Sequence, residues 1–453
     1  MVRPASLRPD EVVSSDQGAV ILADLLYDGL TEVDGASGRL RPGLAIDWTS
    51  DDDFRRWTFR LDPAAGVASG AVVASLQAVS AADDGADPVP VTAASLAVGI
   101  RSVEATDAAT VVVDLLRPNA GLPWILSGLP YSIVGTGGAS TGAYEIDGED
   151  AAGLRLRIRP AFDSGGAGPE TVSVRWADDA SAAYRLLVDG AVDGAVVGPE
   201  SLADAAQRFG WVPTSTSTVR FYVLNAGSPA FGGLDDRLAV VDAVDTEALV
   251  EAADRPDLVA VDGLVSPGAA GWESTASPTG RVAGPAGPAD AADESRAPTP
   301  ATLRLASVGE GGAVLTEALA SQLTEAGHEV LEAAVPAPEL AASIVDGSTD
   351  LFAFGWVAPA SAIDAILPPL LGADSPANVA RIADPEVGSL LERAARTADD
   401  EDRWELLRLA ERSALEEGTL LPVAASGSTL VVSSAESGPV IRADGSLDLE
   451  SSA

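Results

Sequence analysis

Residues 302–334 read TLRLASVGEGGAVLTEALASQLTEAGHEVLEAA and indicate the fold class. Short apolar runs at 303–306 and 330–334 flank a segment, 314–326, in which apolar residues recur at helical spacing. This order predicts a strand, a helix and a second strand, which is typical of an α/β fold. Gly327 ends the predicted helix, and we expect His328, which follows it, to be an exposed turn residue.

The same two periodicities continue on both sides of this stretch. Further strands are predicted at 57–61, 111–115, 154–159, 219–224 and 351–355, and helices at 20–30, 340–345, 385–397 and 402–416. Arginine occupies every second position of 154–159, which indicates a half-buried strand with an arginine face. Two stretches rich in Ala, Gly, Pro and Asp or Ser, 64–90 and 266–301, are predicted to be loops.

Composition excludes several classes of function. The 453 residues carry 68 acidic and 28 basic side chains, a net charge of −40, which repels nucleic acid and anionic lipid. There is no cysteine and no lysine, so thiolate metal sites, phosphate-binding P-loops and Schiff bases are excluded. With one histidine, paired-histidine metal sites are excluded too. We therefore expect no catalytic residue, no metal, no cofactor and no membrane span.

Two patterns leave weaker alternatives. Gly309–Gly312 follows a strand and precedes a helix, but Val314 stands where a dinucleotide-binding loop requires its last glycine, so a tight turn is favoured. Adjacent acidic residues such as Asp83-Asp84 and Asp178-Asp179 allow a carboxylate-dependent hydrolase. Aromatic residues make up only 5% of the chain, which is few for a sugar-binding cleft, and this enzyme stays an alternative.

Several short motifs follow one another along the chain in an order that indicates a family. They are Leu26–Thr31 (LYDGLT), Trp57–Phe59 (WTF), Asn225–Phe231 followed by Arg237 and Asp245, Gly355-Trp356, and Asp384-Pro385 with Leu390-Leu391. Together they resemble the family 5 extracytoplasmic solute-binding proteins, which serve peptide and nickel ABC importers. The resemblance extends over nearly the whole chain.

The resemblance implies a two-lobed, periplasmic-binding-protein-like fold of type II, α/β with mixed sheets and a ligand cleft between the lobes. Lobe 1 would comprise 1–225 plus 426–453, with 46–130 as a subdomain. Lobe 2 would comprise 226–425 and contain the low-complexity loop 266–301. The chain would cross between the lobes near Leu224–Pro229 and Leu420–Ser426.

The same resemblance selects ligand-binding candidates. Trp356 follows the predicted strand 351–355 and would face the cleft, the alternative being a core tryptophan. Gln17 and Gly18 precede the first helix, where the family lays its ligand along the backbone, the alternative being an ordinary helix start. Trp124 and Tyr131 complete the set.

One position departs from the family. An Asp three residues after the Gly-Trp pair holds the peptide amine in the oligopeptide-binding members. Here that position is Pro359, and the nearest acid downstream is Asp364.

The predicted function is capture of a peptide-like or other small solute by hinge closure, without catalysis. The partners would be the ligand and the permease subunits of an ABC importer, and the protein would be a monomer. A degenerate relative with a sensing or scaffold role is the second interpretation. The protein would be extracytoplasmic if an export segment has been removed, and cytoplasmic if Met1 is the true start.

Overall fold

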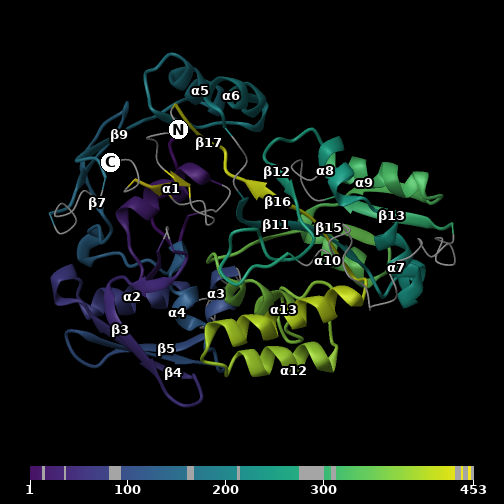
Figure 1. The fold of residues 1–453 in the computed structure, drawn as a ribbon, viewed down its shortest axis with the longest axis horizontal. Helices are drawn as coiled ribbons and strands as arrows, with labels where there is room; N and C mark the ends of the chain where they lie inside the picture. The colour runs from purple at the N-terminus through teal and green to yellow at the C-terminus, as the bar shows by residue number, and fades with distance from the viewer. Residues whose placement is uncertain are drawn as a thin grey trace.

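The computed structural model describes residues 1–12, 16–34, 37–80, 93–160, 168–211, 215–274, 300–307, 313–433, 440–441 and 447–449. Figure 1 shows two lobes side by side, one holding both chain ends and the other most of the second half of the sequence. The strand β16 (Leu420–Gly427) of the right-hand lobe leads into β17 (Leu430–Val432) of the left-hand lobe.

The right-hand lobe is built on a six-stranded sheet. Its strand order is β12 (Leu258–Ala260), β16, β11 (Ser215–Leu224), β15 (Leu351–Val357), β13 (Thr302–Ser307) and β14 (Glu329–Ala334). β13 pairs in parallel with β14 and β15, whereas β11 pairs antiparallel with both β15 and β16. The sheet is therefore mixed, as the family resemblance implied.

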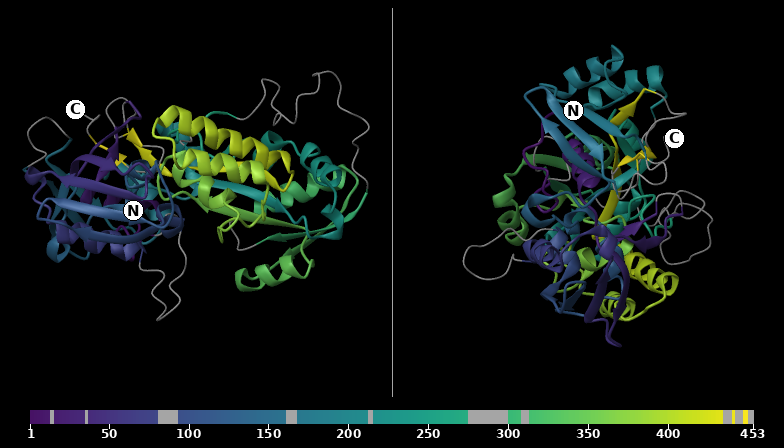
Figure 2. Two further views of the ribbon diagram at one scale, coloured as in Figure 1. Left: turned by 90° about the horizontal axis from the view of Figure 1, so that it is seen from below. Right: turned by 90° about the vertical axis from the view of Figure 1, so that its left-hand side faces the viewer.

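Helices cover both faces of this sheet, because its strands are apolar on both sides. On β15, Phe352 and Trp356 belong to one buried cluster and Leu351 to another. The first cluster is completed by α11 (Leu367–Leu371), α12 (Pro385–Ala394) and α13 (Asp400–Glu416), and the second by α7 (Leu234–Asp242), α8 (Thr246–Ala252) and α9 (Ala313–Glu325). Figures 1 and 2 show the helices on the two faces, with α10 (Ala337–Val345) set apart near the edge strand β14.

The left-hand lobe contains two larger sheets. One has the order β3 (Ala45–Ser50), β4 (Arg56–Leu61), β6 (Thr110–Leu115), β5 (Ile100–Ala105), and α2 (Ser69–Ser80) and α3 (Ala93–Val98) pack on it. The other, β7 (Tyr144–Glu149), β8 (Gly153–Ile158), β9 (Thr171–Arg175), packs against α1 (Gln17–Leu26). β10 (Gly194–Val196) pairs with β17 beside α5 (Ala180–Val188) and α6 (Leu202–Phe209).

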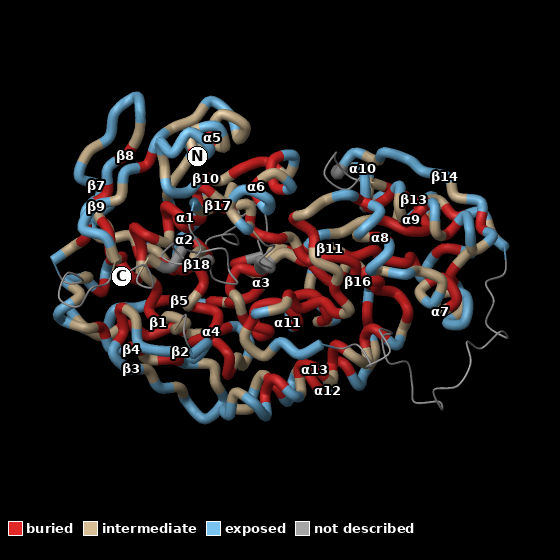
Figure 3. Tube along the Cα trace, turned by 45° about the horizontal axis from the view of Figure 1, so that its top comes forward, coloured by how far each residue is buried: buried red, intermediate tan, exposed pale blue. Residues whose placement is uncertain are grey.

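Smaller elements complete this lobe. They are the pair β1 (Thr31–Val33) and β2 (Leu40–Pro42), the helix α4 (Leu122–Ile125), and the pair β18 (Val440–Ile441) and β19 (Leu447–Asp448). Figure 3 shows that buried residues run through α1, α4 and β5 and continue into α11 and α13 of the other lobe.

The predicted strands and helices are present, and β8 has the expected arginine face, with Arg155 and Arg157 exposed. Two expectations were wrong. Residues 69–80, read as loop, form α2, because Val72, Leu76 and Val79 lie on one helical face and pack in the core. His328 is buried, with 6% of its surface exposed, because the chain turns at Gly327 directly into β14 beside Ala301.

The Gly309–Gly312 turn and residues 275–299 lie outside the described residues. No described helix is both long and apolar enough to cross a bilayer.

Candidate functional site

The two lobes meet in two regions of different character. The first, called here the packed contact, joins residues 120–128 of the left-hand lobe to residues 359–366 and the side chains of Arg403 and Trp404. The second, called the hinge side, surrounds the crossing from β16 to β17 and includes Gln17, Glu200 and residues 427–430. Both regions contain residues that bear on function.

Two glycines let the backbones approach in the packed contact. A Cβ atom at Gly128 would overlap the carbonyl oxygen of Pro359, and one at Gly121 would overlap the carboxylate of Asp364. The amide of Ala120 also donates a hydrogen bond to the carbonyl of Ala395, at 2.9 Å. Any side chain larger than hydrogen at these glycines would separate the lobes.

An ion pair lies inside the packed contact. The Asp364 carboxylate accepts hydrogen bonds from Arg403 Nε at 2.7 Å and from Trp404 Nε1 at 2.8 Å. The side chains of Asp364 and Arg403 are only 4% and 2% exposed. Such a pair is tolerated in the interior because its charges and donors are satisfied. Asp364 is thus fully engaged by its own chain.

The aromatic candidates lie in or near this contact. Trp124 of α4 packs edge-to-face against Trp404 with 5.1 Å between ring centroids, and Trp356 belongs to the same buried cluster. Both Trp124 and Trp356 have an indole N–H that is buried and has no acceptor among the described residues. Tyr131 is fully buried in the neighbouring cluster, donates its hydroxyl to the carbonyl of Ala94 at 2.7 Å, and has its pKa raised by burial.

Gln17 and Gly18 lie on the hinge side. Gln17 Nε2 donates to Ser428 Oγ at 2.5 Å, and Gln17 Oε1 accepts from the Thr429 amide at 2.8 Å and the Thr429 hydroxyl at 2.9 Å. Gly18 is buried in the first turn of α1, where an added Cβ would lie 3.3 Å from the sulfur of Met1. Gln17 therefore links α1 to the crossing by hydrogen bonds. It does not lie together with Trp124 and Trp356, which belong to the packed contact.

Sequence reasoning missed a charged group near the hinge side. Arg255 donates to both carboxylate oxygens of Asp257, at 2.7 and 2.6 Å, and Asp257 is buried. These hydrogen bonds raise the pKa of Arg255, and the carboxylate of Glu200 in the left-hand lobe adds to the effect. Arg220 of β11 lies near the same pair. The sequence does place Arg220 in the otherwise apolar strand 219–224, and this pattern could have indicated the charged group.

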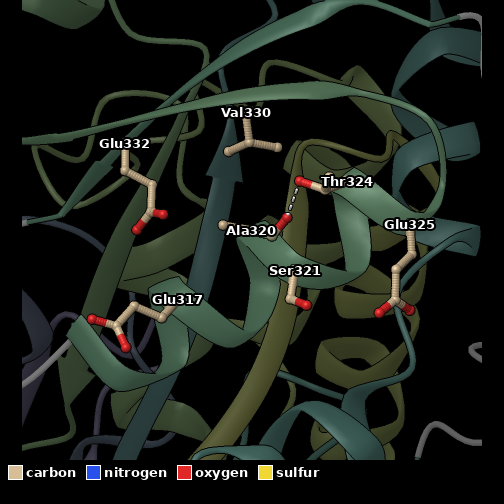
Figure 4. A pocket seen from close by; sticks show the side chains of 7 residues that line it. All are labelled: Glu317, Ala320, Ser321, Thr324, Glu325, Val330 and Glu332. Carbon is tan, nitrogen blue, oxygen red and sulfur yellow. Dashed lines mark hydrogen bonds between the residues drawn. The ribbon is translucent and has the colours of Figure 1, made fainter.

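Two surface hollows lie away from both contact regions. One, of about 450 Å³, lies between α9 and β14 on the outer part of the right-hand lobe and is lined by Glu317, Glu325 and Glu332 among others (Figure 4). Another of about 450 Å³ lies on α12 and α13. Neither includes a predicted ligand-binding residue.

Solved structures with this fold are two-lobed binding proteins. HbpA2 from Haemophilus parasuis matches with a TM-score of 0.81 at 18% identity, covering 99% of this chain and 97% of that one. The unliganded open form of the periplasmic murein tripeptide binding protein MppA matches with a TM-score of 0.79 at 18% identity, covering 100% and 94%. DppA from Helicobacter pylori, in complex with the peptide STSA, matches with a TM-score of 0.69 at 16% identity, covering 100% and 95%.

No curated protein sequence matches this one. The sequence does match, over residues 39–378, the family described as bacterial extracellular solute-binding proteins, family 5. That span includes residues 120–128, residues 359–366 and Glu200 of the two contact regions. Gln17, Arg403, Trp404 and residues 427–430 lie outside it. With the two-lobed mixed α/β fold, it establishes that the chain belongs to family 5 of the bacterial extracellular solute-binding proteins.

Proposed function

We propose that this protein captures a peptide-like solute between its lobes and delivers it to the permease subunits of an ABC importer. One structural observation supports the proposal in addition to family membership. β11 and β16 are hydrogen-bonded neighbours, so both chain crossings leave the sheet at the same end, with Val219 opposite Ala425. Two adjacent crossings allow the lobes to rotate about one axis, as hinge-closing binding proteins do.

The position of the hinge follows from sheet membership. The division at 225/226 and 425/426 stays a prediction, and we propose a refinement of it. Because β11 begins at Ser215 inside the right-hand sheet, we place the first crossing before Ser215. We place the second crossing at Ser428–Thr429, between β16 and β17. The subdomain 46–130 then belongs to the left-hand lobe and meets the other lobe through the packed contact.

Trp356 and Trp124 are the residues we assign to the ligand. A buried donor without an acceptor costs about 1–3 kcal/mol. A peptide carbonyl that entered as the lobes separate would accept from either indole N–H. Gln17, whose three hydrogen bonds are all made within the chain, is assigned a role in positioning the hinge.

Amine recognition differs from that of the oligopeptide-binding members. Pro359 has no charge, its carbonyl packs against Gly128, and Asp364 is occupied by Arg403 and Trp404. A buried ammonium without a carboxylate partner is costly. We therefore expect a peptide and its N-acetylated form to bind with affinities within about threefold of each other, whereas a buried charge pair would separate them by about 30-fold or more. Calorimetry with the matched pair measures this ratio.

The main test is ligand binding without turnover. Thermal-shift screening against di- to pentapeptides should find peptides that raise the melting temperature, and mass spectrometry should recover them intact. If peptides produce no shift, the sensing or scaffold interpretation is favoured. If a glycoside is consumed and a single Asp or Glu substitution abolishes the turnover, the hydrolase interpretation is favoured. A role outside the cytoplasm is part of the proposal, and cell fractionation tests it.

A further inference from the structure

Arg220 differs from the other described arginines. It lies on the central strand β11 and is only partly exposed, yet its guanidinium makes no hydrogen bond or ion pair with any residue that the structure describes. Every other described arginine is either exposed or has a partner in its own chain. In a chain with 68 acidic residues, a half-buried arginine without an acceptor is unexpected.

The surroundings of Arg220 leave room beside its side chain. Its neighbours across the sheet are Gly355 on β15 and Ala424 on β16, and Ala424 is in turn opposite Ala260 on β12. Residues paired across strands share one face of a sheet, so small residues flank Arg220 on both sides. Tyr222 follows two positions later on the same face, where its hydroxyl lies 3.1 Å from that of Thr316.

The charged groups nearest Arg220 are Arg255 and Asp257. Burial, together with the nearby Arg255, lowers the pKa of Arg220, and the opposing effect of Asp257 is smaller. Asp257 already accepts two hydrogen bonds from Arg255. The right-hand lobe therefore contributes two arginines and one aspartate to this group, and the balancing carboxylate, Glu200, comes from the other lobe.

This group faces the other lobe. Glu200 of the left-hand lobe acts electrostatically on Arg255, and the backbone of Asp257 accepts a hydrogen bond from Gly427 at the second crossing. Arg220 lies at the middle of β11, five residues after Ser215, which is opposite Gly427. Arg255, which pairs with Asp257 and lies near Glu200, connects Arg220 to the region where the lobes meet.

We propose that Arg220 binds a carboxylate of the captured solute and so makes the protein selective for anionic ligands. The inference rests on the proposed function, because it places the solute between the lobes. A guanidinium presents two parallel N–H donors that match the two oxygens of a carboxylate. The carboxylate can come from the C-terminus of a peptide or from an acidic side chain, and the experiment separates the two.

The first experiment is calorimetry with three probes: trialanine with a free carboxylate, trialanine amide, and Ala-Glu-Ala amide. The wild-type protein should bind at least one carboxylate-bearing probe about 30-fold more tightly than trialanine amide. Arg220→Met should remove this preference, and the milder Arg220→Lys should keep part of it. Preference for free trialanine identifies the C-terminus, and preference for Ala-Glu-Ala amide identifies a side chain.

A matched control removes the same charge elsewhere. Arg101 on β5 is exposed and belongs to a different sheet in the left-hand lobe, so Arg101→Met should retain the preference. Equal binding of all three probes by the wild-type protein would overturn the inference while leaving peptide capture intact. Loss of the preference in Arg101→Met would attribute it to overall charge and would also overturn it.

The second experiment needs no peptide. If none of the probes binds, the proposed function fails in its peptide form, and succinate at constant ionic strength becomes the probe. It should raise the melting temperature of the wild-type protein and not that of Arg220→Met, and equal shifts contradict the inference. Without ligand, Arg220→Met should melt at the same temperature or higher, because it removes an unpaired, partly buried charge. A lower melting temperature would assign Arg220 to the fold instead.

Discussion

The packed contact and the hinge side join the same two lobes by different means. The packed contact uses apolar side chains, two glycines that lie against Pro359 and Asp364, and a buried ion pair. The hinge side uses hydrogen bonds from Gln17 and a group of charges that includes Arg220, which has no partner in the described part of the chain. The first should resist movement and the second should allow it. The lobes would therefore rotate about the crossings on the hinge side, and the packed contact would separate when they open.

The largest expected effect comes from breaking the ion pair of the packed contact. Asp364→Asn should lower the free energy of unfolding by about 3 kcal/mol, because Arg403 would stay buried without its main partner. Denaturant titration measures the loss. The control is Asp374→Asn, which breaks the 3.1 Å pair with Arg117, whose two side chains are 73% and 77% exposed. That change should cost less than about 0.5 kcal/mol, and equal losses in the two variants would contradict the distinction.

A steric change in the same contact should have the next largest effect. Gly128→Ala would place a Cβ on the carbonyl oxygen of Pro359 and should cost about 2–3 kcal/mol. Thermal unfolding reports the change. Gly70→Ala in α2, where an added Cβ meets no atom within 4 Å, should leave stability unchanged or raise it slightly. If Gly128→Ala lowers stability no more than Gly70→Ala does, the close approach of Gly128 to Pro359 is contradicted.

The anchorage of α13, which carries Arg403, should depend on pH. Glu411 on this helix accepts a hydrogen bond from the Leu264 amide at 2.5 Å, and burial raises its pKa from 4.5 to about 7. Between these values the folded state holds a proton that the unfolded state has lost, so stability falls as pH rises from about 4.5 to 7. The fall should be about 3 kcal/mol.

Glu411→Gln should lack this part of the pH dependence, because the amide does not titrate. Unfolding free energies of both proteins at pH 5 and pH 8 give the difference, which should favour the variant more at pH 8. Glu401→Gln, an exposed change on the same helix, should parallel the wild-type protein. A constant difference between wild type and Glu411→Gln would contradict the assignment.

The smallest expected effect on stability lies on the hinge side. Gln17→Ala removes three hydrogen bonds to Ser428 and Thr429 and should cost about 1 kcal/mol. It should also shift the distribution between open and closed forms, seen as a change in radius of gyration by small-angle X-ray scattering. Gln322→Ala, which breaks two hydrogen bonds to the backbone of Asp245 inside the right-hand lobe, should affect stability only. Identical scattering from both variants would separate Gln17 from the hinge.

The two regions were not equally predictable from sequence. Periodicity found the strands and helices because apolar spacing is a local property, and ordered motifs such as Asn225–Phe231 and Gly355-Trp356 indicated the family. α2 was missed because its small residues, Ser, Gly and Ala, resemble a loop in composition. Asp364 and Arg403 could not be paired, because they are 39 residues apart and meet only through packing. For the same reason the hydrogen bonds of Gln17 to Ser428 and Thr429 could not be predicted, because these partners lie 411 and 412 positions away.

The position of β11 between β15 and β16 also bears on how the chain folds. β11 begins at Ser215, yet the strands on its two sides begin only at Leu351 and Leu420. During synthesis the centre of the largest sheet must wait for most of the remaining chain, with both edges of β11 unpaired. Contacts so distant in sequence slow folding and prolong exposure of apolar strands. The left-hand subdomain 46–130, built from near neighbours, should therefore fold early, and completion of β16 should set the rate for the rest.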